Sequence, residues 1–241
     1  MSGLLLATTP RGAHPGHSHY GERMKSPVPV IAILALAVAT AALAACGSSD
    51  SKVSVDKLQQ AADKAKAAPT EPCPVGFDIN AALKKAGVSG TAVPDSGSDD
   101  PDAHPVDAES ATDVKDGSPL QTFGGGMITC TYKLSTGGYV EATLTGVRHG
   151  QAVALMAPVL SRDAEISTGD IEKVVTQKYD AGKAVLMPGA GLAAVVALKA
   201  SGGNAALEVT STTGGGNDEK NPIVGEQLRN LAEELGKQVK V

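Results

Sequence analysis

The chain has 241 residues and a net charge of −5 at pH 7, from 21 Lys and Arg against 26 Asp and Glu. This acidic balance argues against a nucleic-acid-binding protein, and against a protein that binds anionic headgroups through a basic face. Aromatic residues make up only 2% of the chain and Trp is absent, so a sugar-binding cleft that stacks on aromatic rings is not favoured.

An apolar run at residues 30–39 is followed by Leu43-Ala44-Ala45-Cys46, and Lys25 places a positive charge ahead of it. This pattern is typical of a bacterial lipoprotein signal, in which small residues precede a cysteine that is acylated and becomes the first mature residue. Residues 24–45 are therefore predicted to be a signal peptide. Cys46 is predicted to carry a diacylglycerol that holds the protein on the extracytoplasmic face of the cell membrane.

An uncleaved transmembrane helix is the alternative, but it would need about 20 strongly apolar residues, and this run is rich in Ala and follows Pro29. Residues 1–23 are unusual ahead of a signal peptide and are interpreted as an extension from a start codon assigned too early. Three histidines there have metal-ligand spacing, but cleavage would discard them, so no metal site is predicted: His14, His17 and His19.

The chain has three cysteines. With Cys46 lipidated, Cys73 and Cys130 remain as a pair in a compartment where disulfides persist, so we expect them to form a structural disulfide. No Cys-x-x-Cys spacing suggests a redox or metal role. From Cys46 onward the net charge is −7, because the first 45 residues hold three basic side chains and one acidic one.

Residues 46–71 are expected to be a lipid-anchored stalk with a short helix. Val55, Leu58, Ala62 and Ala65 recur at helical spacing, but the helix is only weakly apolar, so it is expected to be a spacer or a loosely docked element. Residues 72–241 are expected to form a single globular domain.

Near the start of this domain, Asp78 is expected to cap a short helix from Ile79 to Ala86 that ends at Gly87. Residues 93–119 hold eight acidic side chains and one Lys, a composition that predicts a mobile, solvated loop. The alternative is a calcium site, but this segment lacks the turn Gly and the terminal Glu of an EF-hand loop.

The clearest β signal is a hairpin, in which apolar residues alternate over 128–134 and 139–147 on either side of a Gly-containing turn. Cys130 lies on its apolar face. A second hairpin is predicted from 192–199 and 205–210.

Three more segments have a helical or ambiguous pattern. Residues 149–164 read as a helix kinked or interrupted at Pro158, and 171–179 suit a helix or a strand equally. The last helix is expected to start with Asn221 as N-cap and Pro222 in its first turn, with one apolar face. Helices alternating with hairpins predict an α+β fold, an antiparallel sheet packed against helices.

No catalytic residue or cofactor site is predicted. The mature chain has only two histidines, His104 in the acidic loop and His149 before a helix, and neither has an identifiable partner. Gly189-x-Gly191-x-x-Ala194 matches a dinucleotide fingerprint, but the residues after it suggest a strand where that fingerprint needs a helix.

Four pieces of the sequence carry a resemblance to a known family: Pro72-Cys73-Pro74 before a short helix ending at Gly87, Cys130-Thr131-Tyr132 in the first hairpin, Pro188-Gly189-Ala190-Gly191-Leu192 before the second, and a closing amphipathic helix. Residues 72–241 thereby resemble actinobacterial cell-envelope lipoproteins of unknown function, of the LpqN type with a PsbP-like sandwich. The resemblance implies an envelope location, a Cys73–Cys130 bridge and no established catalytic residues. The family commonly has Trp where Tyr132 stands.

These observations predict a membrane-anchored, non-enzymatic binding module of the cell envelope, with an envelope protein or a lipid as its partner. The alternative is a carrier that holds a lipid or another apolar ligand in a cavity between the sheet and the helices.

Overall fold

The structure, a computed structural model, describes residues 53–69, 72–95, 104–115, 117–163, 166–212 and 223–241. Its main sheet is antiparallel, with the order β2-β4-β5-β9-β7-β6, and β3 pairs with the same edge of β4 as β2. The described strands of this sheet are β2 (Ala92–Pro94), β3 (Val106–Ser110), β4 (Gly125–Leu134), β5 (Tyr139–Val147), β6 (Ala184–Leu186), β7 (Ala193–Leu198) and β9 (Asn204–Thr212).

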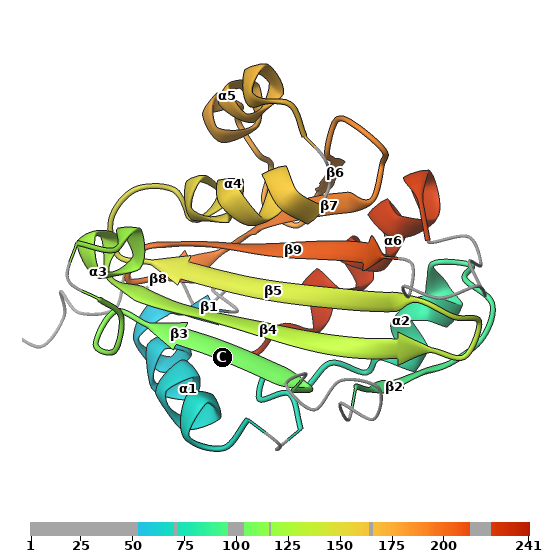
Figure 1. The fold of residues 1–241 in the computed structure, drawn as a ribbon, viewed down its shortest axis with the longest axis horizontal. Helices are drawn as coiled ribbons and strands as arrows, with labels where there is room; N and C mark the ends of the chain where they lie inside the picture. Colours follow the sequence, from blue (N-terminus) through green and yellow to red (C-terminus); the bar gives the residue numbers. More distant parts are fainter. Residues whose placement is uncertain (1–52, 70–71, 96–103, 116, 164–165, 213–222) are drawn as a thin grey trace, which may run out of the picture. The chain divides into compact units, whose positions relative to one another are not determined.

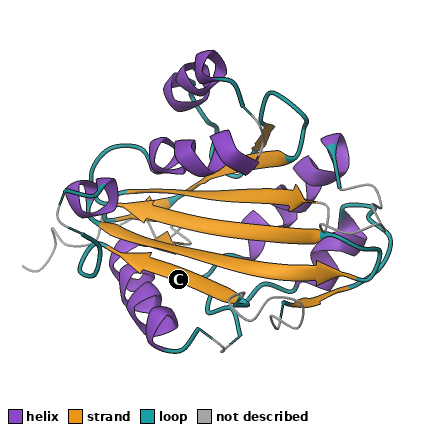
Figure 2. Ribbon diagram, in the orientation of Figure 1, coloured by secondary structure: helices purple, strands orange, loops and turns teal. Residues whose placement is uncertain are grey.

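Two short strands, β1 (Val53–Ser54) and β8 (Ala200–Ser201), pair in parallel outside this sheet. Figure 2 shows the sheet as one layer with helices on its two sides. The described helices are α1 (Val55–Ala67), α2 (Ile79–Lys85), α3 (Pro119–Phe123), α4 (Ala152–Asp163), α5 (Thr168–Thr176) and α6 (Gly225–Gln238). The predicted α+β class is confirmed.

Both predicted hairpins are confirmed. β4 pairs with β5, with Cys130 opposite Ala142, and β7 pairs with β9, with Val196 opposite Leu207. The strand alternation buries Cys130 and its apolar neighbours on one face of β4. The strand β7 follows the Gly189–Gly191 turn directly, so this turn does not lead into the helix that a dinucleotide fingerprint requires.

The sheet has a hydrophobic core on each face. One core contains buried side chains of α1, α2 and α6, such as Leu58, Leu83 and Leu231, packed on Ile128 and Leu144 of the sheet. The other contains side chains of α4 and α5 packed on the opposite face of β5, β7 and β9. Figure 1 shows α4 and α5 (yellow and orange) on the other side of the strands from α1 (blue).

The expectation of a loosely docked first helix was wrong. In α1, Val55, Leu58 and Ala62 are completely buried, and the helix packs on β3 and β4. The sheet accepts it closely because two strand residues lack side chains: a Cβ on Gly126 would lie 3.0 Å from Gln59 Cα, and one on Gly146 would lie 2.8 Å from Leu58 Cδ2. The helix is part of the core, although its own apolar residues are few and small.

The acidic segment 93–119 is not a loop throughout. Val106–Ser110 forms β3, whose residues pair with β4 from Val106 opposite Cys130 to Ser110 opposite Gly126. Asp107 and Glu109 are exposed while Val106 and Ser110 are buried, so charged side chains alternate with buried ones. Residues 96–103, where part of the mobile loop was expected, lie outside the described residues.

Helix boundaries differ from the prediction in three places. The ambiguous segment 171–179 contributes to α5, which Ser167 caps by accepting a hydrogen bond from the Asp170 backbone N–H. Helix α4 continues through Pro158. Helix α6 starts later than expected, with Val224 in place of Asn221 at its N-cap, and the predicted cap Asn221 and first-turn Pro222 lie outside the described residues. The cap at Asp78 is confirmed by its hydrogen bond from the Ala81 N–H, 2.9 Å long.

Tyr132 lies on the helix-covered face of β4, where its side chain is 4% exposed, and burial raises the pKa of its hydroxyl to about 12. The unfolded chain ionises this group near pH 10, so between about pH 10 and 12 the folded state keeps a proton that the unfolded state loses. The contribution of Tyr132 to stability should be constant below about pH 10. It should then fall by roughly 2 to 3 kcal/mol as the pH rises to about 12.

This dependence can be measured by urea unfolding at several alkaline pH values. Tyr132→Phe keeps the ring and removes the titrating hydroxyl, so its free energy of unfolding should decline less steeply above about pH 10 than that of the unchanged chain. Equal slopes for the two proteins would show that Tyr132 is not protected from ionisation.

Candidate functional site: a groove beside helix α1

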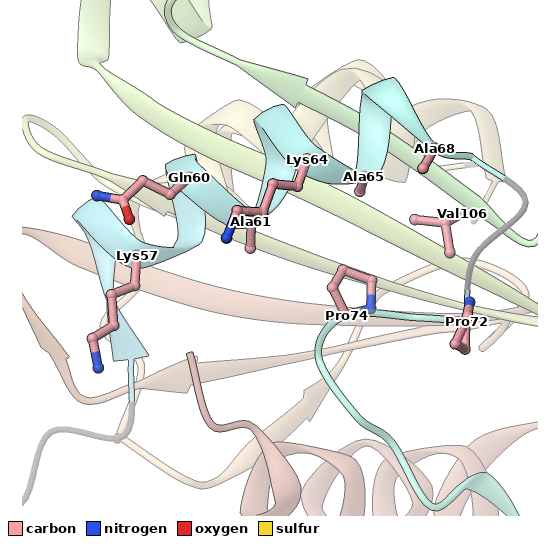
Figure 3. Close-up of a pocket in the computed structure, with 9 residues that line it drawn as sticks. All are labelled: Lys57, Gln60, Ala61, Lys64, Ala65, Ala68, Pro72, Pro74 and Val106. Atoms are coloured by element: carbon pink, nitrogen blue, oxygen red, sulfur yellow. The ribbon is translucent and has the colours of Figure 1, made fainter.

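A groove of about 450 Å³ runs along the outer side of α1. The helix forms one wall and the segment Pro72–Pro74 the other, with Val106 of β3 between them (Figure 3). Its size lies within the usual range of small-ligand sites. The lining residues are Lys57, Gln60, Ala61, Lys64, Ala65, Ala68, Pro72, Pro74 and Val106.

The periodicity of α1 places the polar rim of this groove. Lys57, Gln60 and Lys64 are spaced by three and four residues, so they share one side of the helix, and all three are exposed. Figure 3 shows the long side chains of Lys57, Gln60 and Lys64 projecting from α1, with the short side chains of Ala61 and Ala65 on the same helix. The groove therefore has a polar rim and a floor of small apolar side chains.

The facing wall is fixed by the predicted disulfide, which is confirmed. Cys73 and Cys130 are bonded, with their Cα atoms 5.7 Å apart. Because Val106 pairs with Cys130 across the β3–β4 ladder, the bond holds Pro72 and Pro74 beside Val106 at one end of the groove. A covalent link between segments 57 residues apart thus shapes this surface.

The rim is electrostatically positive. Among the described residues, neither Lys57 nor Lys64 forms an ion pair, whereas Lys66 of the same helix is paired with Asp113, with 2.5 Å between Nζ and Oδ2. The two acidic residues of α1 are also engaged away from the groove. Asp56 accepts hydrogen bonds from Arg148, and Asp63 accepts one from Thr112.

A second hollow, of about 300 Å³, has an acidic lining and contains His104, one of the two histidines considered as candidate catalytic residues. Its lining residues come from β3, β4, β5, β9 and the segments beside them: Asp95, His104, Asp107, Thr131, Tyr139, Glu141 and Thr212. Across the part of the chain that the structure describes, no group of three or more His, Cys, Asp or Glu could hold a metal ion. Residues 96–103 of the acidic segment, for which a calcium site was the alternative, lie outside the described residues.

Two other candidate residues remain. His149 lines neither hollow, and Cys46 lies outside the described part of the chain. His149 is exposed between β5 and α4, and its backbone N–H donates to the carbonyl of Phe123 over 3.0 Å. Cys46, the predicted lipid-bearing residue, lies outside the described residues, as do residues 30–39. Within the described ranges, no helix combines the length and apolar character needed to cross a membrane.

Sequence reasoning did not find the groove, because α1 was interpreted as a spacer or a loosely docked element. The available signal was the spacing of Lys57, Gln60 and Lys64 opposite the apolar stripe of the same helix. The far wall had no local signal, since it depends on a disulfide to a distant strand. A scan against protein-family models, a search of curated proteins and a search of solved structures each gave no match.

Proposed function

We propose that this chain is a lipid-anchored, extracytoplasmic protein of the bacterial cell envelope, and that its α+β domain is a non-enzymatic binding module that uses the groove beside α1. The anchor rests on the sequence Leu43-Ala44-Ala45-Cys46 after an apolar run. The resemblance to envelope lipoproteins of the LpqN type supports the same location.

The observation that carries the binding role is the groove itself. Its apolar lining of Ala, Pro and Val side chains lies beside a rim with two lysines that form no ion pair within the described part of the chain. A small apolar surface edged by available donors is the usual composition of a ligand site. The disulfide at Cys73 holds one wall in place, so the surface exists before a partner binds.

A carrier with its cargo between sheet and helices is the second function that the sequence suggested. The large side chains in that layer, including Leu58, Leu144, Leu207 and Leu231, have 0% exposure. A void large enough for water beside them would leave accessible surface, so their own packing fills the space around them. This favours the outer groove as the binding surface.

Replacing Cys46 by Ala tests the anchor in cells. The acylated residue is lost, so we expect the full chain expressed in an actinobacterial host to leave the detergent-extractable membrane fraction, or to remain unprocessed at the signal peptide. Ser48→Ala is a matched control and should stay with the membrane. Equal membrane retention of the Cys46→Ala protein, with residues 1–45 removed, would contradict the proposal.

A further inference from the structure

We propose that the groove beside α1 binds the headgroup of an anionic phospholipid from the bilayer in which Cys46 is anchored. The inference rests on the proposed function, because lipidation at Cys46 is what would bring this groove to a membrane.

The charge of the groove selects an anionic headgroup. Its described lining has two lysines and no acidic side chain, although the chain as a whole has a net charge of −5. Binding to anionic headgroups was disfavoured on the net charge of the whole chain. That sum does not show the local positive charge of the groove rim. Several other cations, such as Lys66 and Arg148, are paired with carboxylates, whereas Lys57 and Lys64 form no ion pair among the described residues, so their ammonium groups are available at the rim of the groove.

The spacing of the rim residues fits a phosphate above an apolar floor. Lys57 and Lys64 are seven residues apart, which places their Cα atoms about 10 Å apart along the helix, with Gln60 between them. A phosphate between the two lysines can accept hydrogen bonds from both ammonium groups and from the Gln60 amide. The glycerol and the first methylene groups would then lie on Ala61 and Ala65.

The position of α1 shortly after Cys46 in the chain keeps the groove close to the membrane surface. Lys57 follows Cys46 by 11 residues, which can span at most about 40 Å, so the groove is never far from the lipid surface. Each lysine near an anionic surface contributes about 1 kcal/mol, which is too little to recruit a free protein. A tethered groove meets headgroups at a high effective concentration, and two lysines are then enough to select among them.

The charge of the rest of the mature domain affects how the domain is oriented on the membrane. The net charge of −7 from Cys46 onward is repelled by an anionic bilayer, so the domain is expected to meet the bilayer through a locally positive surface such as the rim of this groove. The groove would thus also orient the domain on the membrane.

The test is native mass spectrometry of the full lipidated chain in an uncharged detergent, titrated with dioleoyl phosphatidylglycerol or with dioleoyl phosphatidylcholine. We expect a one-to-one complex with phosphatidylglycerol and weaker binding of phosphatidylcholine. Replacing both groove lysines, Lys57→Gln with Lys64→Gln, should weaken phosphatidylglycerol binding by about 30-fold, at roughly fivefold per lysine. The matched control, Lys178→Gln with Lys183→Gln, changes the net charge equally at two exposed lysines outside the groove and should bind as the unchanged chain does.

Equal affinity of the groove variant and the control variant would overturn the inference, as would equal binding of the two lipids. Displacement of the lipid by an equimolar amount of inorganic phosphate would also overturn it, because a free anion would then be the ligand. The same spectra report the mass added at Cys46. A lipidated chain without selective binding therefore refutes the headgroup inference alone, and a chain that carries no lipid refutes the proposed function.

Discussion

Replacing both Cys73 and Cys130 by Ala should lower the free energy of unfolding by about 4 kcal/mol. The bond closes a loop across a separation of 57 residues, and the chain-entropy relation for a loop of this length gives about that value. Ala is the appropriate substitute because Cys130 is 0% exposed, and a Ser hydroxyl there would add the cost of a buried donor.

Urea unfolding at equilibrium measures this loss. Reduction of the unchanged chain by a thiol reagent is the control, since it opens the same loop without a substitution and should give a similar decrease. A decrease below about 1 kcal/mol in both experiments would mean that the loop is already restricted in the unfolded chain or that the bond strains the fold.

Leu58→Ala should destabilise the protein by about 2 to 5 kcal/mol, the usual range for removing a fully buried leucine. Leu58 is 0% exposed and belongs to the core shared by α1 and the sheet, where its Cδ2 atom packs over Gly146. The cavity would not collapse easily, because α1 already approaches the strand backbone closely at Gly126.

Gln60→Ala is the matched control two residues along the same helix. Gln60 is exposed, and Ala is at least as good a helix former, so the free energy of unfolding should change by no more than about 0.5 kcal/mol. The comparison decides whether α1 is part of the core. Similar small effects for both substitutions would restore the interpretation of α1 as a loosely docked spacer.

The first hairpin was predictable because apolar residues alternate along β4, where every second side chain from Ile128 to Leu134 is buried. Cys130, Tyr132 and their neighbours show this period in the sequence alone, and the disulfide followed from the two cysteines that remain once Cys46 is assigned to lipid. These predictions depended on local pattern and on simple counting, and both are properties that a single sequence contains.

The errors arose where the deciding partner is distant in the sequence. The burial of α1 depends on Gly126 and Gly146, which provide space for a helix that has few large apolar residues of its own. In β3 the charges of Asp107 and Glu109 dominated the interpretation, although Val106 and Ser110 alternate with them and are buried against other elements.

The groove was hidden for the same reason. Lys57 and Lys64 have the pattern of an ordinary solvated helix face, and only the disulfide-held segment at Pro72 and Pro74 makes this face one wall of a hollow. Net charge also gave no indication of this rim, because a sum over the chain does not report the charge of a surface a few residues wide.

The most direct test of the account is the intact mass, under denaturing conditions, of the chain extracted from the membranes of an actinobacterial host. The account predicts a polypeptide that starts at Cys46, carries the mass of a diacylglycerol, and lacks the two protons that Cys73 and Cys130 lose on forming their disulfide. A mass that includes residues 1–45, or a chain starting at Cys46 without lipid, would contradict it.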